Sequence, residues 1–227
     1  MKNSVIISLF ILVIIGGSAL FWRAHRYDEP GNIAPPPAGT ASAYFAGGCF
    51  WCTESDFEKL PGVSEAISGY SGGTTTDPSY TSVSSHTTGH VEAVEVRYDP
   101  TVVTYQTLVS YFFSHIDPTD PAGQFADQGD SYRSVVFYRT SEEKDIIEKE
   151  KERLAQSGAY EKQLVTTIIP FDTFYPAEEY HQNYWKKNPT RYAYYRSGSG
   201  RDQYLKKICQ IRAEKNIPCL NEKELRN

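Results

Sequence analysis

Methionine is almost absent from this chain, because Met1 is the one methionine among 227 residues. A thioether is easily oxidised, so a protein that works among oxidants gains by carrying few of them. Long runs of lysine and arginine are also missing, and the net charge is −5. Without a basic run that could follow a phosphate backbone, the sequence argues against a nucleic-acid partner.

Cysteine is scarce as well, with four in all: Cys49, Cys52, Cys209 and Cys219. A structural zinc site needs four nitrogen or sulfur ligands, commonly in two close pairs. Cys209 and Cys219 stand ten positions apart in no finger-like spacing, which disfavours zinc. The C-x-x-C pair Cys49 and Cys52 leaves a redox-active pair or two inert core residues as alternatives.

The start of the chain does not resemble part of a folded domain. Val5 to Trp22 carries no charged residue and is long enough to cross a bilayer. A cleaved signal peptide is the alternative, since Gly17-Ser18-Ala19 offers a small-residue cleavage pattern. The apolar run continues to Trp22, so we expect a retained, helical membrane anchor or signal segment in residues 1–26. A proline-rich linker over residues 27–42 would follow it.

The charges that flank the apolar segment give only a weak indication of its orientation in the membrane. Lys2 lies on one side of the apolar run, and Arg23 and Arg26 lie on the other, which tilts the charge rule towards a cytoplasmic C-terminus. An amino-terminal tail this short is typical of an export signal. We therefore expect the rest of the chain on the extracytoplasmic side, in the periplasm or at the cell surface.

The patterns after the linker alternate between strand and helix. Strands are expected over residues 43–46, 63–70, 90–98, 132–139 and 164–169, and helices after Cys49, after the cap Thr104, and from the cap Ser141 to near Gly158. Long loops over residues 69–85 and 117–130 have room for functional groups. The sequence thus predicts an α/β class, as a single two-layer sandwich domain with a mixed sheet.

One short run, Gly47-Gly48-Cys49-Phe50-Trp51-Cys52, carries the strongest chemical signal. The glycines permit a sharp turn between the expected strand and helix. Cys49 then lies in the first turn of the helix, where free N–H groups and the helix dipole favour a thiolate. We therefore predict that Cys49 is a nucleophilic thiol with a lowered pKa.

The strand over residues 90–98 contains a conflict of polarity. Val94, Val96 and Tyr98 share one face, and by parity Glu92 belongs on that apolar face. Either the carboxylate is solvated at the end of the strand, or it is buried and held neutral by desolvation. A buried neutral acid can donate a hydrogen bond, as a general acid must.

Several motifs in order give the chain a resemblance to a known family. They are Gly48 to Trp51, Gly69 to Gly73, Pro78-Ser79-Tyr80, Thr88 to Val94, Asp127 with Tyr132-Arg133-Ser134, and Ala177 to Gln182. With these motifs the chain resembles the A-type peptide methionine sulfoxide reductases, which reduce the S epimer of methionine sulfoxide. The resemblance covers most of a catalytic domain at residues 43–209, before a polar tail at residues 210–227.

The resemblance implies a role for each matched residue. Cys49 would attack the sulfoxide sulfur and become a sulfenic acid, and Phe50 and Trp51 would form the apolar wall for the substrate's S-methyl group. His181 would be structural rather than catalytic. The acid that binds or protonates the sulfoxide oxygen would be Glu92; the hydroxyls of Tyr80 and Tyr132 would hold this oxygen, and Asp127 would orient the site.

Recycling of the sulfenic acid is the open point. The glycine-rich cysteine segment typical of many members is absent from this tail, so we rank Cys209 first, Cys52 second and Cys219 third as the resolving thiol. The implied partners are oxidised proteins or free methionine sulfoxide and a thioredoxin-like reductant, with no metal or organic cofactor. The alternative function is a membrane-tethered thiol–disulfide oxidoreductase that uses Cys49 and Cys52 as its exchange pair.

Overall fold

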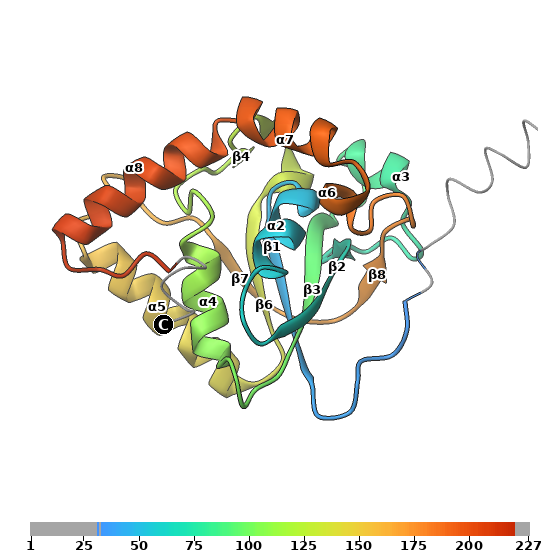
Figure 1. Cartoon of the computed structure of the whole chain (residues 1–227), viewed down its shortest axis with the longest axis horizontal. Coiled ribbons are helices and arrows are strands. Elements are labelled where there is room, and N and C mark those ends of the chain that lie inside the picture. The colour runs from blue at the N-terminus through green and yellow to red at the C-terminus, as the bar shows by residue number, and fades with distance from the viewer. Residues whose placement is uncertain (1–30, 32, 221–227) are drawn as a thin grey trace, which may run out of the picture.

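A mixed six-stranded sheet forms the centre of the structure, a computed structural model that describes residues 31 and 33–220 (Figure 1). The strand order is β7-β6-β1-β3-β2-β8. These strands are β1 (Ala41–Gly47), β2 (Val63–Ser71), β3 (Val91–Tyr98), β6 (Ser134–Tyr138), β7 (Thr167–Pro170) and β8 (Phe174–Pro176). Only β6 and β7 run parallel within this sheet. The described residues therefore form one α/β domain with a mixed sheet, as the sequence predicts.

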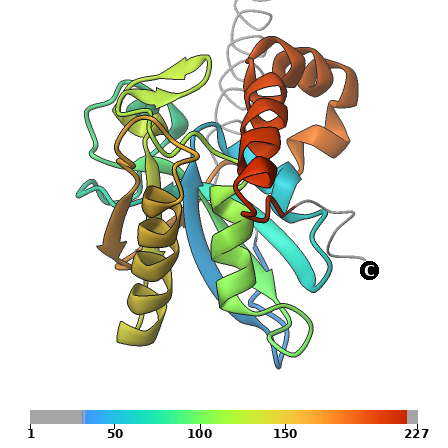
Figure 2. The same cartoon turned by 90° about the vertical axis from the view of Figure 1, so that its left-hand side faces the viewer.

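Helices cover one face of this sheet. They are α2 (Phe50–Phe57), α4 (Tyr105–Phe113) and α5 (Ser141–Gln156), and α4 lies beside α5 in front of the sheet in Figure 2. The apolar positions of alternate strand residues, such as Phe45 and Val94, meet helix residues such as Phe57 and Phe112 in one buried cluster. Burial of this shared apolar surface fixes α2, and hence its N-terminus, against the central strands.

Among the described residues, strands and the β7–β8 connection supply the buried cluster on the opposite face of the sheet. Phe137 and its apolar neighbours form a second buried cluster there, packed against side chains from the β7–β8 connection. Tyr44 stacks on Phe171 of this connection, with ring centroids 3.8 Å apart. Aromatic and aliphatic side chains together thus cover this face.

Both expected loops contain short regular elements. The first holds α3 (Tyr80–Ser84), whose N-cap Ser79 forms a reciprocal capping box with Ser82. The second holds the hairpin strands β4 (Gly123–Gln124) and β5 (Asp127–Gln128) and the turn η1 (Asp130–Tyr132). Elements this short are fixed by caps and long-range contacts, so no periodic pattern in the sequence indicates them.

The N-cap predicted for α4 is confirmed, and the N-cap of α5 differs from the prediction by one residue. The Thr104 side chain accepts from the backbone N–H of Thr107, as expected for an N-cap. The N-cap of α5 is Thr140, whose side chain accepts a hydrogen bond from the Glu143 N–H. We predicted Ser141 as the cap, so the observed cap lies one residue earlier and Ser141 is the first residue of the helix.

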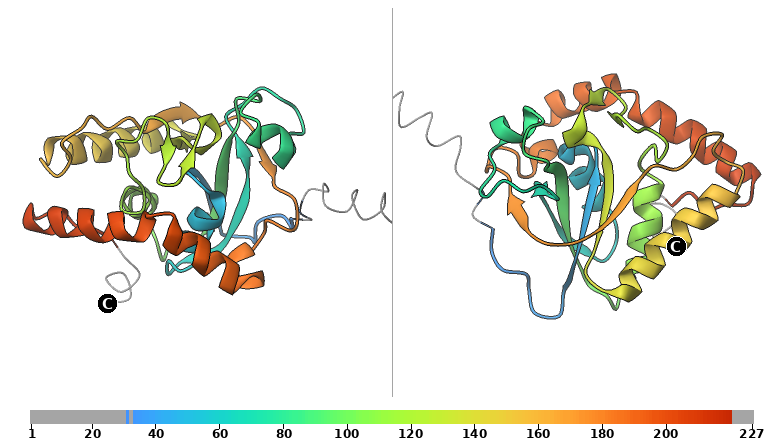
Figure 3. Two further views of the ribbon diagram at one scale, coloured as in Figure 1. Left: turned by 90° about the horizontal axis from the view of Figure 1, so that it is seen from above. Right: turned by 180° about the vertical axis from the view of Figure 1, so that it is seen from behind.

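The part of the domain that follows β8 is helical, and the sequence predicts no elements there. It comprises α6 (Tyr184–Lys187), α7 (Pro189–Gly198) and α8 (Arg201–Glu214). Seen from above in Figure 3, α7 and α8 follow one another along one side of the domain. Helix α8 continues past residue 209, where we placed the start of a polar tail.

The predicted anchor at residues 1–26 lies outside the described residues. In the described part of the chain, no helix has the length and apolar character needed to cross a bilayer. Part of the predicted linker is described, and it touches the domain: the carbonyl of Ala34 accepts a hydrogen bond from Arg97 Nη1 at 2.7 Å.

Candidate active site

Cys49 lies at the junction of β1 and α2, as the N-cap residue of the helix. The turn depends on Gly48, which has a φ of +83° and whose added Cβ would lie 2.5 Å from Gln124 Cβ. An L side chain is disfavoured in this conformation, so glycine is required here. Cys49 is 6% exposed, and its side chain forms no capping hydrogen bond with the helix.

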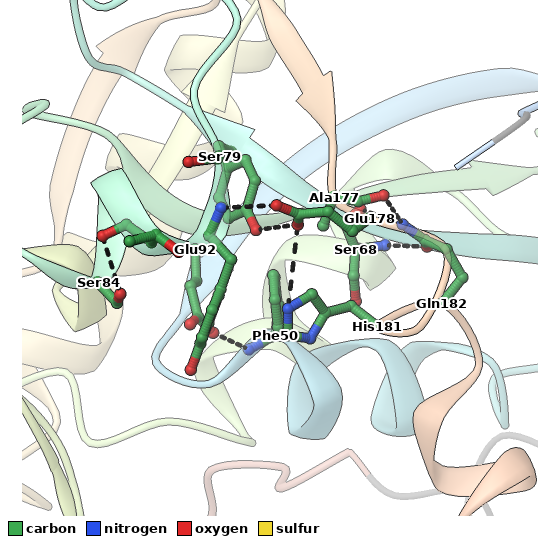
Figure 4. Close-up of polar contacts among 12 residues, drawn as sticks. Phe50, Ser68, Ser79, Ser84, Glu92, Ala177, Glu178, His181 and Gln182 are labelled. Carbon is green, nitrogen blue, oxygen red and sulfur yellow. Dashed lines mark hydrogen bonds and ion pairs between the residues drawn. The ribbon is translucent and has the colours of Figure 1, made fainter. Parts of the chain in front are cut away.

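Glu92 lies on β3, between β1 and β2 in the sheet, and is 3% exposed. Its Oε2 accepts a hydrogen bond from the backbone N–H of Phe50 at 2.9 Å (Figure 4). Burial raises the pKa of Glu92 to about 8, while the hydrogen bonds from Phe50 and Tyr132 oppose this shift. Of the two alternatives for Glu92, a solvated carboxylate or a buried neutral acid, the structure has the buried acid. Its carboxyl group is protonated at neutral pH.

Two tyrosine hydroxyls face this carboxyl. Burial and the charge of Glu92 raise the pKa of Tyr80 to about 12 and raise the pKa of Tyr132 as well. Both hydroxyls keep their protons and remain hydrogen-bond donors. The structure thus brings Tyr80, Tyr132 and Glu92 to one place, next to Cys49, which contributes to both tyrosine shifts.

Tyr80 is held by a residue for which the sequence predicts no role. Glu178 accepts the Tyr80 backbone N–H at 2.7 Å and the Tyr70 hydroxyl at 2.8 Å. The Glu178 side chain is buried and links α3 to β2. It lies within a motif that we recognised, but nothing in the local pattern predicts contacts to residues about a hundred positions away.

An aromatic wall stands beside the cysteine. Phe50 is 1% exposed, and Trp51 stacks flat on Tyr184 with ring centroids 3.7 Å apart. The indole N–H of Trp51 donates to His181 Nδ1 at 3.0 Å. Burial lowers the pKa of His181 to about 3, so the ring is neutral and acts as an acceptor that orients Trp51. This geometry fits the structural role expected for His181.

Asp127 has a partner that the sequence did not reveal. The hydroxyl of Tyr195, on α7, donates to Asp127 Oδ2 at 2.5 Å. The same ring meets Trp51 edge-on, with centroids 5.8 Å apart. Burial raises the pKa of Asp127, and the charge of Arg201 opposes the shift. Among 17 tyrosines, no spacing singles out Tyr195.

The four cysteines fall into two groups. Cys209 and Cys219 are joined in a disulfide in this structure. Cys49 and Cys52 are free and buried. Cys209, which we ranked first, is thus paired with Cys219 here, and Cys52, ranked second, is a free thiol three residues after Cys49. The ranking of the resolving cysteines stays a prediction.

The pKa values of the free cysteines Cys49 and Cys52 differ from those that the sequence predicts. Burial raises the pKa of Cys49, and Cys52, Glu92 and Asp127 raise it further. A hydrogen bond from Cys49 and the charges of Arg201 and Arg196 lower the pKa of Cys52 to about 7. The expected lowering at Cys49 is therefore absent, because burial next to acidic groups outweighs the helix N-terminus.

Comparison with known proteins agrees with this geometry. A family model described as peptide methionine sulfoxide reductase matches residues 41–213. The chain is 50% identical over 163 residues to peptide methionine sulfoxide reductase MsrA of Listeria monocytogenes, covering 72% of this chain and 92% of that protein. The chain is 48% identical over 163 residues to the MsrA of Bacillus subtilis, covering 72% of this chain and 92% of that protein.

One relative is longer than this chain and aligns with it over only part of its own length. The chain is 49% identical over 200 residues to the MsrA/MsrB protein of Vibrio cholerae, covering 88% of this chain and 52% of that protein. The chain thus spans about half the length of this relative.

Solved structures share the fold. Reduced Mxr1 from Saccharomyces cerevisiae has a TM-score of 0.64 at 33% identity, covering 70% of this chain and 91% of that one. Methionine sulfoxide reductase A of Corynebacterium diphtheriae has a TM-score of 0.61 at 32% identity, covering 72% and 89%. The chain belongs to the peptide methionine sulfoxide reductase family, A type, and its activity is the thiol-dependent reduction of methionine S-sulfoxide.

Proposed function

We propose that Cys49 attacks the sulfoxide sulfur while Glu92 donates its proton to the sulfoxide oxygen. The sulfur–oxygen bond to methionine breaks, the oxygen passes to Cys49 as a sulfenic acid, and methionine leaves. The proton of the Cys49 thiol restores the proton lost by Glu92. Sulfur in the substrate is reduced by two electrons, and the sulfur of Cys49 is oxidised by two.

The observation that carries this proposal is the neutral carboxyl of Glu92 bonded to the residue next to Cys49. A sulfoxide is a poor electrophile until its oxygen carries a proton. An ionised carboxylate would also repel the thiolate that forms during attack. The protonated acid avoids both problems, and the hydroxyls of Tyr80 and Tyr132 add two donors for the oxygen.

The aromatic wall supports the substrate assignment. Phe50 and Trp51 are proposed to receive the S-methyl group, since both are apolar and lie directly after Cys49. Asp127, fixed by Tyr195, is proposed to orient the polar part of the substrate. Oxidised methionine in proteins and free methionine sulfoxide both present these groups.

Cys52 is proposed to resolve the sulfenic acid. Its sulfur attacks that of Cys49, water leaves, and a Cys49–Cys52 disulfide forms. A dithiol reductant of the thioredoxin kind then returns both residues to thiols. The proposal is supported by the neighbouring free pair and by the disulfide that engages Cys209 and Cys219.

Separated epimers of a protected methionine sulfoxide test these roles, with residues 41–227 and dithiothreitol as reductant. We expect reduction of the S epimer alone, with loss of activity in Cys49→Ser and retention with dithiothreitol in Cys52→Ser. Insulin disulfide reduction without sulfoxide reduction would instead support the exchange-pair alternative. Such a result would contradict the role assigned to Glu92.

The cellular location is a separate proposal: the anchor holds the domain on the extracytoplasmic side. The Cys209–Cys219 disulfide supports it, because disulfides persist in oxidising compartments. A reporter that is active only in the periplasm, fused after residue 40, should be active. An inactive periplasmic reporter together with an active cytoplasmic one would contradict the proposal.

A further inference from the structure

His86 adopts a backbone conformation that favours glycine. It lies at an exposed position in the turn after α3, where its φ is +60° and its N–H donates to Val83 O at 2.9 Å. This left-handed conformation is uncommon for a residue with a Cβ, and the surrounding structure must hold it in place. Because glycine would take the same conformation without strain, the contacts of the imidazole are what distinguish a histidine here.

The imidazole binds the turn η1, which ends at a tyrosine of the site. His86 Nδ1 accepts the backbone N–H of Ser131 at 3.4 Å and lies 3.0 Å from the Ser131 hydroxyl oxygen. A backbone N–H can only donate, so Nδ1 is the acceptor in this contact. Ser131 is 1% exposed, and a buried hydroxyl requires a hydrogen-bond partner. His86 thus supplies a partner to two groups of one buried residue in η1.

Gly129 leaves room for the imidazole ring. A Cβ added to Gly129 would lie 2.5 Å from both Cε1 and Nε2 of His86, and the φ of this glycine is +115°. A side chain here would therefore displace the ring. The carbonyl of Gly129 accepts the Tyr132 N–H at 2.9 Å, which closes the turn. The ring is thus packed directly against the turn that positions Tyr132.

His86 also joins the two segments that carry the tyrosines of the site. Helix α3 begins at Tyr80 and ends at Ser84, two residues before His86. On the other segment, the rings of His86 and Tyr132 meet edge-on, with centroids 6.1 Å apart and an interplanar angle of 71°. The Tyr132 side chain in turn hydrogen-bonds with Glu92 and with Tyr80. The contacts of His86 therefore lead to the hydroxyl beside the proposed acid.

The neighbouring side-chain contacts of this turn lie at the surface. Arg133 Nε donates to Asp130 O at 3.1 Å, and these two side chains are 42% and 77% exposed. An ion pair this exposed contributes little to holding a segment. The contacts of His86 with the buried Ser131 are better placed to fix the turn.

We propose that His86 is a positioning residue for sulfoxide reduction, because its imidazole fixes η1 to the segment after α3 and so holds the Tyr132 hydroxyl where the sulfoxide oxygen binds. This inference rests on the proposed function, in which Tyr132 donates to that oxygen. A donor that is already in place needs no reorganisation as charge develops on the oxygen. The contact therefore acts on the rate of reduction more than on the affinity for the substrate.

His86→Gly tests this role in the full chain, since it removes the imidazole and relieves the backbone conformation. We expect the Tm to change by no more than a few degrees, because relief of strain offsets the lost hydrogen bonds. The single-turnover rate at saturating S-sulfoxide should fall by about 5–10-fold, the loss expected for one hydrogen bond, with the half-saturating concentration within about twofold. An unchanged rate, or a loss confined to the half-saturating concentration, would overturn the proposal.

His86→Asn is the matched rescue. Asparagine tolerates the left-handed conformation, and its Oδ1 can accept from Ser131 as Nδ1 of the histidine does. We expect this variant to recover most of the rate lost in His86→Gly, and a rate equal to that of the glycine variant would contradict the role of the acceptor.

Asn216→Gly is the control for the backbone change alone. Asn216 has a φ of +55° and is exposed in the turn after α8, where its N–H donates to Ala213 O at 3.0 Å. We expect its single-turnover rate to equal that of the wild type. Equal losses in Asn216→Gly and His86→Gly would show an effect of glycine itself and would overturn the proposal.

A double-mutant cycle with Tyr132→Phe separates a positioning role from a general structural one. Tyr132→Phe keeps the ring and removes the hydroxyl, so its placement no longer matters. His86→Gly should then lower the rate less than twofold, against about 5–10-fold in the wild-type background. Equal losses in both backgrounds would overturn this inference and leave the role of Tyr132 intact. If Tyr132→Phe alone reduces the sulfoxide at the wild-type rate, the proposed function of the hydroxyl fails, and this inference falls with it.

Discussion

Glu92 accepts a hydrogen bond from the backbone N–H of Phe50 at 2.9 Å, and Phe50 directly follows Cys49, the proposed nucleophile. This bond joins the central strand β3 to the first turn of α2. It places a carboxyl with a raised pKa beside Cys49. The acid and the thiol are thus positioned by backbone geometry that the core holds rigid.

Replacing Glu92 with glutamine removes the proposed proton donor and keeps a side chain of nearly the same size and shape. We expect the single-turnover rate of sulfoxide reduction to fall by about 10²–10³-fold, in the range for general acid catalysis. In the wild type, the same rate should fall above about pH 8, where Glu92 loses its proton. Rapid-quench measurements from pH 6 to 10 check both effects, and persistence of the alkaline fall in Glu92→Gln would contradict the assignment.

Glu54 provides a matched control, because it is also a buried carboxyl on α2 whose pKa burial raises to about 8. Its Oε1 accepts the Asn183 N–H at 2.5 Å, and its other oxygen accepts the Ser68 hydroxyl. These contacts tie α2 to β2 and to the N-cap of α6 and do not involve Glu92, Tyr80 or Tyr132. Glu54→Gln should leave the alkaline fall in rate unchanged.

Glu54 also predicts how stability depends on pH. Its folded-state pKa is raised above the unfolded value of 4.5, so its contribution to stability is present below about pH 4.5 and is lost as the pH rises towards 8. The stability of the wild type relative to Glu54→Gln should therefore decrease over this range, by on the order of 1–4 kcal/mol. Urea unfolding at pH 5 and pH 8 measures it, and a difference that grows with pH would be contrary to expectation.

Removing the Tyr195 hydroxyl should weaken substrate binding. In Tyr195→Phe, Asp127 loses the 2.5 Å hydrogen bond that fixes its carboxyl, while the ring still packs against Trp51. We expect KM to rise about tenfold with a small change in kcat, since a hydrogen bond to a charged group contributes roughly 1.5–3 kcal/mol. Tyr194→Phe is the control, because Tyr194 lies on the same helix and is 85% exposed. Equal effects of both substitutions would contradict the role of Asp127.

Breaking the C-terminal disulfide should affect stability rather than recycling. A disulfide that closes a loop of this length stabilises by about 2–3 kcal/mol, so Cys209→Ser should lower the Tm by several degrees. Turnover with a thioredoxin reductant at 25 °C should remain close to that of the wild type. A selective loss of turnover, with single-turnover reduction intact, would instead show that Cys209 takes part in recycling.

Local patterns predicted the parts of the site that depend on neighbouring residues. Strand parity placed Glu92 on the buried face, and the glycine turn placed Cys49 at the start of a helix, because both follow from backbone periodicity. Burial and the neighbouring Cys52 raise the pKa of Cys49, which opposes the lowering predicted from the helix N-terminus.

The supporting residues could not be predicted from the sequence. Tyr195 and Arg201 reach the site from α7 and α8, across separations of 68 and 154 residues from their partners. Their positions are set by tertiary packing of the C-terminal helices, which leaves no local signal. The pairing of Cys209 with Cys219 is likewise a matter of where two segments meet in space.

Mass spectrometry after a single turnover measures the proposed chemistry most directly. The reduced chain is mixed with one equivalent of S-sulfoxide without reductant, then alkylated and digested. We expect one methionine per chain, loss of the Cys49 and Cys52 thiols to a shared disulfide, and a Cys49 sulfenic acid trapped by dimedone in Cys52→Ser. Methionine formed by Cys49→Ser, or a wild-type chain that retains its Cys49 thiol after turnover, would contradict nucleophilic attack by Cys49.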